Sequence, residues 1–128
     1  YNANPASMRA AFGALKLRKP SGQGRKIAVI GEMLELGPDS RALHAALAEP
    51  LITAGVDQVI GVGEGARALM DALPAEHRAA WCETAESAIE TLSELARDGD
   101  VVLVKGSNAS GVHKLVSSLR DKAKPASA

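Results

Sequence analysis

The stretch RKIAVIGEMLELGPDS (residues 25–40) decides the predicted fold of this chain. The consecutive apolar residues at 27–30 are typical of a strand that is buried on both faces, and Gly31 follows them where the chain has to turn. Asp39 and Ser40 then offer suitable N-cap side chains for a helix. A strand, a loop and a capped helix form half of a βαβ unit, and ligands bind beside the carboxyl ends of such strands. We therefore expect the functional chemistry in the loop that joins this strand to its helix.

Strand and helix patterns alternate along the rest of the chain. Apolar runs at 58–62 and 101–104 predict further strands, and a weaker pattern at 79–82 predicts another. The predicted helices begin at or near Pro5, Ser40, Ala66, Thr84 and Val112. Alternation of this kind favours a parallel sheet with right-handed crossovers and helices on both faces. The predicted fold is therefore α/β: a Rossmann-like three-layer sandwich in which a mostly parallel sheet is flanked by helices.

Particular residues predict where the helices begin and bend. Asn4 followed by Pro5 is a favourable N-cap and first helical position, and Thr84 is a second N-cap. The helix at 40–54 should be kinked at Pro50, because proline removes one backbone donor and crowds the preceding turn.

The length of 128 residues suits one domain, which we assign to residues 1–121, with a frayed tail over 122–128. Tyr1 and Asn2 are interpreted as the end of a strand whose beginning is cut off. We therefore expect this chain to be a domain of a larger protein.

Charge and composition restrict the kinds of partner. The 15 basic residues balance 15 acidic ones, so the chain lacks the basic excess that binding to a phosphate backbone requires, and nucleic acid is not expected as a partner. A single cysteine excludes an internal disulfide, and no apolar stretch is long enough to span a bilayer or to act as a signal sequence. We interpret the compartment as cytosolic.

One motif supports an alternative function. Gly61, Gly63 and Gly65 follow a predicted strand in the spacing of a dinucleotide-binding loop, and Glu83 lies about where a ribose-binding acid belongs. The alternative is a free-standing dinucleotide-binding module. Against it, the motif follows the second complete strand instead of the first and precedes a very short helix, so a simple turn is the competing interpretation.

Two loops carry candidate binding groups. Glu32 and Glu35 lie in one short loop and are suited to orient an amine or a metal ion. Lys105 begins a polar loop at 105–111 whose backbone amides, together with the lysine, are suited to hold a carboxylate or a phosphate. This loop does not have the spacing of a Walker A motif. For both loops, a plain solvated connection is the competing interpretation.

The remaining polar residues do not form a complete catalytic set. His44, His77 and His113 share no metal-ligand spacing, and each is interpreted as a surface or helix-end residue. Cys82 beside Trp81 is interpreted as a packed core thiol. No nucleophile triad can be assembled, so neither a catalytic residue nor a metal site is predicted.

Three segments taken together resemble one family. They are YNANP (1–5) with Ser7 and Met8, GEMLELG (31–37) with Ser40 and His44, and VLVKGS (102–107). In this order and spacing they are similar to the C-terminal domain of the MurF family of Mur ligases, the UDP-N-acetylmuramoyl-tripeptide D-alanyl-D-alanine ligases of peptidoglycan synthesis.

The resemblance implies a bacterial, cytoplasmic ligase of three domains, of which this chain is the third. The N-terminal domain for the UDP-sugar and the central domain, which binds most of the ATP and Mg2+, would lie outside it. The full-length enzyme makes an acyl phosphate from ATP and the carboxylate of UDP-N-acetylmuramoyl-tripeptide, and the amine of D-alanyl-D-alanine then attacks to form the amide. The isolated chain is therefore expected to be inactive.

The resemblance also implies site residues. Tyr1, Asn2 and Asn4 would lie near the nucleotide. The residues expected near the dipeptide are Lys105, Gly106, Ser107, Asn108, Glu32 and Glu35. The chain departs from the family at Asn108, where Arg is common, and at His113, near which an acid is expected.

Overall fold

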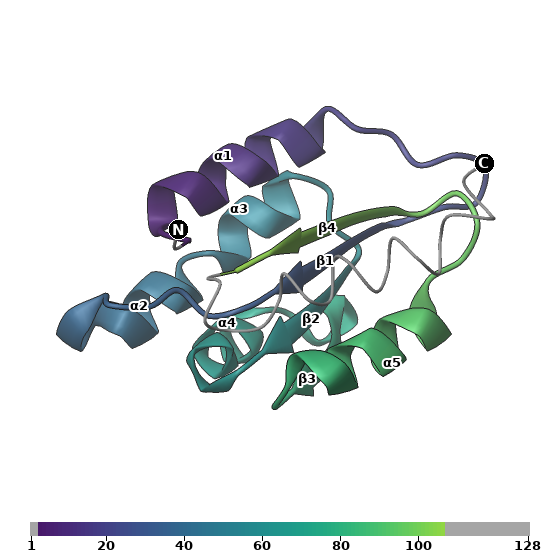
Figure 1. The fold of residues 1–128 in the computed structure, drawn as a ribbon. Helices are drawn as coiled ribbons and strands as arrows, with labels where there is room; N and C mark the ends of the chain where they lie inside the picture. The colour runs from purple at the N-terminus through teal and green to yellow at the C-terminus, as the bar shows by residue number, and fades with distance from the viewer. Residues whose placement is uncertain (1–2, 107–128) are drawn as a thin grey trace.

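The computed structural model describes residues 3–106 and contains a four-stranded parallel sheet (Figure 1). Its strands are β1 (Lys26–Ile30), β2 (Gln58–Val62), β3 (Arg78–Cys82) and β4 (Val101–Lys105), in the spatial order β3-β2-β1-β4. Each neighbouring pair is parallel. The predicted α/β fold is confirmed, and so are all of the strands predicted within the described residues.

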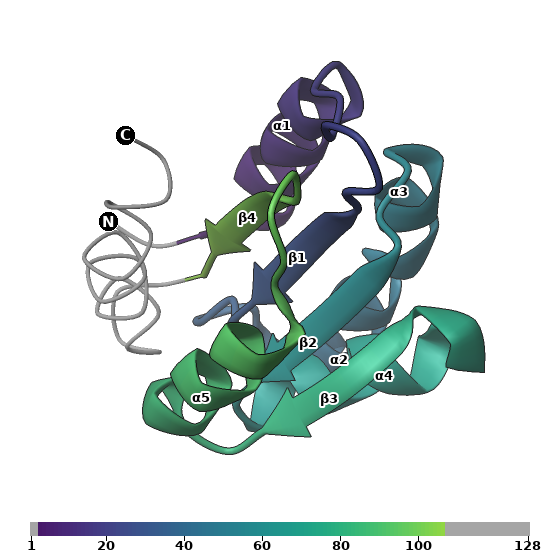
Figure 2. The ribbon, with the colours of Figure 1, turned by 90° about the vertical axis from the view of Figure 1, so that its right-hand side faces the viewer.

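Helices cover both faces of this sheet. They are α1 (Pro5–Lys16), α2 (Ser40–Ala45), α3 (Ala48–Thr53), α4 (Arg67–Ala72) and α5 (Ala85–Leu95), with short 3₁₀ turns at Gly37–Asp39, Glu64–Ala66 and Ala75–His77. Figure 2 shows α5 on one face of the sheet, with α1, α3 and α4 behind the other. The predicted closing helix at 112–119 lies outside the described residues.

The core lies in two layers that meet at β1. Ala28 and Ile30 face the layer formed with α1, α3 and α4, while Ile27 and Val29 face the layer formed with α5. All four residues are fully buried, as the unbroken apolar run predicted. Burying a large aliphatic side chain contributes about 1.5–3 kcal/mol, so β1 is the strand on which both layers depend.

Two of the predicted N-caps, Asn4 and Thr84, are confirmed. The Asn4 side chain accepts a hydrogen bond from the Ser7 backbone N–H at 2.9 Å, and the Ser7 hydroxyl accepts from the Asn4 N–H at 3.0 Å. Thr84 accepts from the Ser87 N–H at 3.2 Å. Each cap satisfies helix-terminal donors that would otherwise lack a partner, which stabilises a helix by about 1 kcal/mol.

The long helix predicted from Ser40 toward Ala54 was wrong, because the chain forms two short helices, α2 and α3. The break lies at Ala46 and Leu47, one turn before Pro50. Proline cannot donate to the carbonyl four residues earlier, which here is that of Ala46, and its ring crowds the same group. The predicted kink has therefore become a complete interruption, and Ala46 at the break is exposed.

Asp39 stands at the N-cap position of α2, as predicted, but its side chain does not cap the helix. A 3₁₀ turn at Gly37–Asp39 leads directly into α2, and the Asp39 side chain makes no capping hydrogen bond. Backbone that is already helical at the cap position carries the Asp39 side chain away from the free amides, because an N-cap requires extended backbone there.

Charged groups at the amino ends of the strands bind backbone atoms. The Lys26 ammonium is buried and donates to the carbonyls of Ala54 (2.9 Å) and Lys16 (3.1 Å), which close α3 and α1. The Asp100 carboxylate accepts from the backbone N–H groups of Arg25 and Arg97, both at 2.8 Å. These contacts tie the helix ends to the sheet at its amino edge.

Burial by itself raises the pKa of the Asp100 carboxyl, but the hydrogen bonds from the Arg97 and Arg25 backbone and the nearby Arg25 guanidinium outweigh it. The pKa of Asp100 is therefore lowered from its ordinary value. The folded state consequently favours the charged form of this carboxyl.

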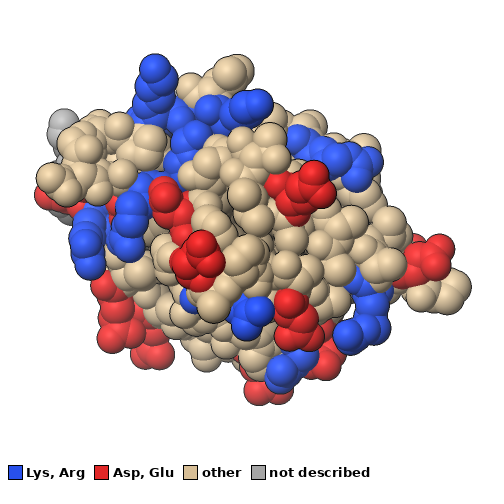
Figure 3. Space-filling view, turned by 180° about the vertical axis from the view of Figure 1, so that it is seen from behind, with Lys and Arg blue, Asp and Glu red and all other residues tan. Residues whose placement is uncertain are grey.

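The surface carries charges of both signs. Figure 3, which views the molecule from behind, shows lysine and arginine side chains interspersed with acidic ones over this face. Within residues 3–106, the helices are all too short or too polar to cross a membrane.

Candidate functional site

The carboxyl ends of β1 and β4 lie side by side. Ile30 is paired with Lys105 in the parallel register, and the Gly31 backbone N–H donates to the Lys105 carbonyl at 2.8 Å. The loop that carries Glu32 and Glu35 therefore leaves the sheet beside the end of β4. In Figures 1 and 2 the start of α1 also lies at this edge, near the tip of β4.

The structure places the described members of the predicted site as follows. Glu32, Lys105 and Gly106 are half-buried, whereas Glu35 is exposed. Glu35 has a φ of 59°, a left-handed conformation that a residue with a side chain seldom adopts. Within residues 3–106, Lys105 forms no ion pair. Lys105 at the end of β4 thus lies next to the start of the loop that carries the two carboxylates, although these segments are far apart in the sequence.

Asn4 is exposed, and its side-chain oxygen caps α1. Four predicted site residues lie outside the described residues: Tyr1, Asn2, Ser107 and Asn108. Their roles remain predictions.

Glu32 reaches across to the turn after β2. Its Oε2 atom accepts a hydrogen bond from the Gly65 backbone N–H at 2.9 Å. A Cβ atom at Gly63 would lie 2.6 Å from Glu32 Oε1, and Gly63 has a φ of 89°, so this position requires glycine on two grounds. The turn at Gly63 and Gly65 therefore packs closely against the Glu32 carboxylate of the same chain.

This contact argues against the dinucleotide-binding alternative. The Gly65 amide, which that alternative offers to a phosphate, is bonded to an internal anion. Both backbone groups of Gly63 are also engaged: its N–H donates to Cys82 O at 2.9 Å, and Trp81 Nε1 donates to Gly63 O at 2.7 Å. The glycine motif is thus a turn packed against Glu32, and a bound phosphate would meet a negative charge.

Sequence reasoning missed the role of His44. It was interpreted as a surface or helix-end residue, but its exposure is 0%. Its Nε2 accepts from the Met33 backbone N–H at 3.0 Å, and its Nδ1 lies 2.8 Å from the Ser40 carbonyl. The available signal was the four-residue spacing of Ser40 and His44, which places both on one side of a helix directly after the loop.

Other interpretations of single residues can be compared with the structure. Cys82 is buried, with its sulfur 3.6 Å from the Thr91 hydroxyl oxygen, so its assignment as a packed core thiol is confirmed.

The Arg67 guanidinium lies 3.7 Å from the Trp81 ring centroid and pairs with Glu64 at 2.9 Å. These contacts close the outer side of the turn after β2.

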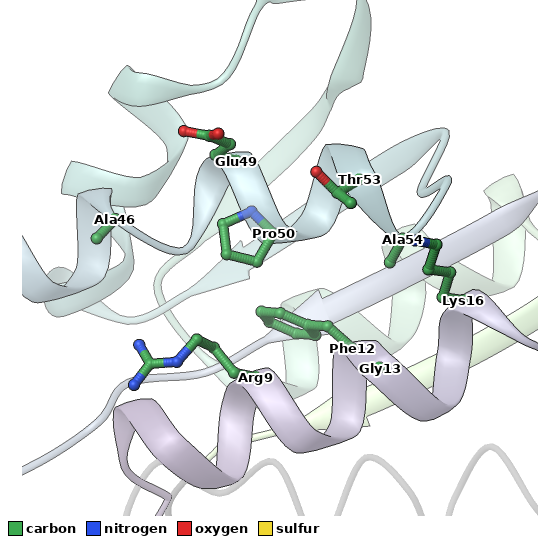
Figure 4. Close-up of a pocket in the computed structure, with 9 residues that line it drawn as sticks. All are labelled: Arg9, Phe12, Gly13, Lys16, Ala46, Glu49, Pro50, Thr53 and Ala54. Atoms are coloured by element: carbon green, nitrogen blue, oxygen red, sulfur yellow. The ribbon is translucent and has the colours of Figure 1, made fainter.

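A separate groove of about 520 Å³ lies between α1 and α3 (Figure 4). Arg9, Phe12 and Lys16 line it from α1, and Glu49 and Pro50 line it from α3, with the Phe12 ring pointing toward Pro50. None of the predicted site residues lines it. The grouping of lysine, carboxylates and strand ends makes the carboxyl edge the better candidate site, because ligands of parallel α/β sheets bind there.

A parallel α/β sheet with helices on both faces defines a Rossmann-like domain. A family model described as "Mur ligase, glutamate ligase domain" matches residues 1–108. The chain belongs to this family of ligases, and the resemblance seen in its three motifs is confirmed.

Individual relatives agree with this assignment. The chain is 35% identical over 116 residues to a UDP-N-acetylmuramoyl-tripeptide--D-alanyl-D-alanine ligase of Rickettsia prowazekii, covering 91% of this chain and 25% of that protein. It is 35% identical over 124 residues to the ligase of the same name from Escherichia coli K12, covering 94% and 26%. The chain thus spans about a quarter of the length of the curated relatives it matches.

Solved structures show the same fold. The MurF ligase from Thermotoga maritima in complex with ADP superposes with a TM-score of 0.76 and 28% identity, covering 98% of this chain and 27% of that one. MurF from Acinetobacter baumannii gives 0.79 and 30%, covering 94% and 27%. The family assignment therefore favours a ligase domain over a free-standing dinucleotide-binding module.

Proposed function

We propose that this chain is the C-terminal domain of an ATP-dependent ligase that joins D-alanyl-D-alanine to UDP-N-acetylmuramoyl-tripeptide. We take the substrates from the names of its relatives. We infer that the chain is one domain because it matches only about a quarter of their length. The remaining domains of the longer protein would bind the UDP-sugar and most of the ATP. The isolated chain would be inactive.

The observation that carries this proposal is the pairing of β1 with β4. Gly31 donates a hydrogen bond to the Lys105 carbonyl, so the end of β4 lies beside the start of the loop that carries Glu32 and Glu35. A dipeptide substrate has a carboxylate at one end and an amine at the other. One edge that carries both a lysine and two carboxylates has complementary charges for both ends.

We assign the dipeptide carboxylate to Lys105 and to the donors of the following loop, Gly106, Ser107 and Asn108. Charge-assisted hydrogen bonds of this kind contribute about 1.5–3 kcal/mol each. The incoming amine has to lose its proton before it attacks the acyl phosphate, and the carboxylates of Glu32 and Glu35 are the nearby groups suited to orient it.

The Glu32 and Glu35 carboxylates differ in their contacts and exposure. Oε2 of Glu32 is bonded to Gly65, and its Oε1 has no hydrogen-bond partner among the residues that the structure describes. Glu35 is exposed. We therefore propose that Glu35 reaches the substrate freely, whereas Glu32 does so from a fixed position through its second oxygen.

We assign the nucleotide-proximal role to Tyr1, Asn2 and Asn4, at the start of α1. The capped N-terminus of this helix lies at the same edge as Lys105, and a helix N-terminus favours negative charge nearby. Residues 3–106 contain no cluster of three histidine, cysteine or acidic side chains that could hold a metal ion. We assign Mg2+ to the central domain of the longer protein.

The test is a dipeptide-dependent assay of the full-length protein. With ATP, Mg2+ and UDP-N-acetylmuramoyl-tripeptide present, phosphate release should require D-alanyl-D-alanine and should produce the extended peptide. Phosphate release that is independent of the dipeptide, or that responds better to another amine, would contradict the proposed substrate. Calorimetry with NAD on the 128-residue chain tests the dinucleotide alternative, and no binding heat is expected.

A further inference from the structure

We propose that His44 is a positioning residue for the ligase reaction: as a neutral imidazole it holds the loop after β1 against the turn after β2. This proposal rests on the proposed function, because the loop it holds carries Glu32 and Glu35. His44 itself is buried, so it acts through the loop without touching the substrate.

The first step of the argument is the hydrogen bonding of the ring. Met33 N–H donates to His44 Nε2, and this nitrogen must therefore carry a lone pair. The proton of the neutral ring then lies on Nδ1, which is 2.8 Å from the Ser40 carbonyl and donates to it. A protonated ring would place a second donor opposite the Met33 N–H. The geometry thus requires one tautomer of the neutral ring.

The second step is burial. Met33 is 2% exposed and His44 is 0% exposed, so water cannot replace the ring as the acceptor for the Met33 amide. An apolar side chain of similar size at 44 would fill the space but leave this amide without a partner. Packing alone therefore does not account for a histidine at this position.

The third step connects His44 to the opposite loop. A Cβ atom added at Gly65 would lie 3.1 Å from His44 Nε2 and 3.0 Å from Glu32 Oε2. The Gly65 amide also donates to that carboxylate oxygen. His44 and Glu32 thus both lie against Gly65. Of two consecutive loop residues, Glu32 is bonded to the turn at Gly65 and Met33 is bonded to His44 of α2. The loop has two anchors, one to α2 and one to the turn at Gly65.

A measurement on the unmodified chain tests the tautomer directly. Nitrogen-15 NMR of the imidazoles at neutral pH should show His44 with a protonated Nδ1 and an acceptor-type Nε2, coupled to the Met33 amide across the hydrogen bond. A protonated ring, or the tautomer with the proton on Nε2, would overturn the proposal. This result does not depend on any ligase activity.

Two variants separate positioning from packing. His44→Phe keeps the ring volume and removes the acceptor, while His44→Gln retains an acceptor near the position of Nε2. In His44→Phe, amide exchange at Met33 and Gly65 should accelerate about ten- to a hundredfold, because a buried donor loses its partner. His44→Gln should keep most of the protection. Equal loss in both variants, or acceleration that includes the amides of α5, would show that the ring only fills space.

His77→Phe is the matched control. This histidine is half-buried and lies beside Asp57 O at the amino end of β2, remote from the loop, so its replacement should leave exchange at Met33 and Gly65 unchanged. An effect of His77→Phe equal to that of His44→Phe would contradict a specific role for His44.

In the full-length ligase, His44→Phe should lower kcat/KM for the dipeptide by about tenfold or more and leave KM for ATP unchanged, whereas His44→Gln should restore most of the activity. Full dipeptide activity in His44→Phe would overturn the positioning role. An unmodified protein that does not use the dipeptide would refute the proposed function instead, while the tautomer and exchange results would still decide what His44 does to the loop.

Discussion

The two edges of the sheet use charged residues in different ways. At the amino edge, Lys26 and Asp100 are buried or nearly so, and their charges are neutralised by backbone carbonyls, amides and the Arg25 guanidinium. At the carboxyl edge, Lys105 has no ion-pair partner among residues 3–106, and Glu35 is exposed. The first edge therefore holds the fold together, whereas the second leaves these charges without an ion pair among residues 3–106, as the proposed substrate site requires.

Glu32 combines features of the amino edge and the carboxyl edge. One carboxylate oxygen is bonded to Gly65, as at the amino edge, yet the residue lies in the loop of the candidate site. A charge bonded to the backbone adds stability, whereas an unpaired one adds little stability and is available to bind. Variants at the two edges should therefore change different measured quantities.

The largest stability effect is expected for Lys26→Met. The methionine keeps the apolar stem but removes both hydrogen bonds, so the carbonyls of Lys16 and Ala54 lose their charged donor. We expect the free energy of unfolding to fall by roughly 3 kcal/mol, measured by urea denaturation of the chain. Lys19→Met, at an exposed position in the connector, is the control and should change it by less than about 0.5 kcal/mol. Equal effects of the two variants would remove the distinction between the edges.

Lys105→Ala should lower the activity of the ligase and leave its stability nearly unchanged. We expect kcat/KM for D-alanyl-D-alanine to fall by about ten- to a hundredfold in the full-length ligase, since a charge-assisted contact to the substrate carboxylate is lost. Steady-state kinetics with ATP and tripeptide saturating measures this, and the midpoint of urea denaturation should shift little. An unchanged kcat/KM would show that Lys105 is a solvated loop residue and would direct attention to Glu32 and Glu35.

Asp100→Asn tests the amino edge through pH. Because the pKa of Asp100 is lowered by folding, its contribution to stability is complete above its unfolded-state pKa of about 3.9 and is lost as the pH falls through the lower folded-state value. We expect the variant to be about 1–2 kcal/mol less stable at pH 7, with the difference shrinking below pH of about 4. Urea denaturation at several pH values measures it, and a difference that does not depend on pH would show that the charge of Asp100 is unimportant.

The smallest effect is expected for Asn2→Ala in the full-length enzyme. If the start of the chain lies near the nucleotide, KM for ATP should rise by less than about tenfold, the effect of one neutral hydrogen bond, and KM for the dipeptide should rise less. Steady-state kinetics with each substrate varied in turn distinguishes the two. Equal rises in both would count against a nucleotide-proximal role.

Local sequence patterns correctly predicted much of the secondary structure of this molecule. The apolar run at 27–30 predicted a strand buried on both faces, and Asn4 and Thr84 predicted helix caps that the structure contains. Each of these features depends on residues that are close in the sequence. The break at Ala46 shows the limit of such patterns, because the apolar periodicity continues through 40–54 although Pro50 removes a hydrogen bond.

Sequence alone determined the α/β class, the strand positions and the family, because alternation of apolar runs and short motifs express local preferences. Tertiary structure decided that Glu32 binds Gly65 and that His44 is buried against Met33. It also decided that Lys26 closes two helices. The partners of Glu32 and Lys26 lie up to 33 residues away and become neighbours only when parallel strands pair. A carboxylate or an imidazole has the same sequence pattern whether it binds its own backbone or a substrate, and only the three-dimensional position of the nearest donor distinguishes the two.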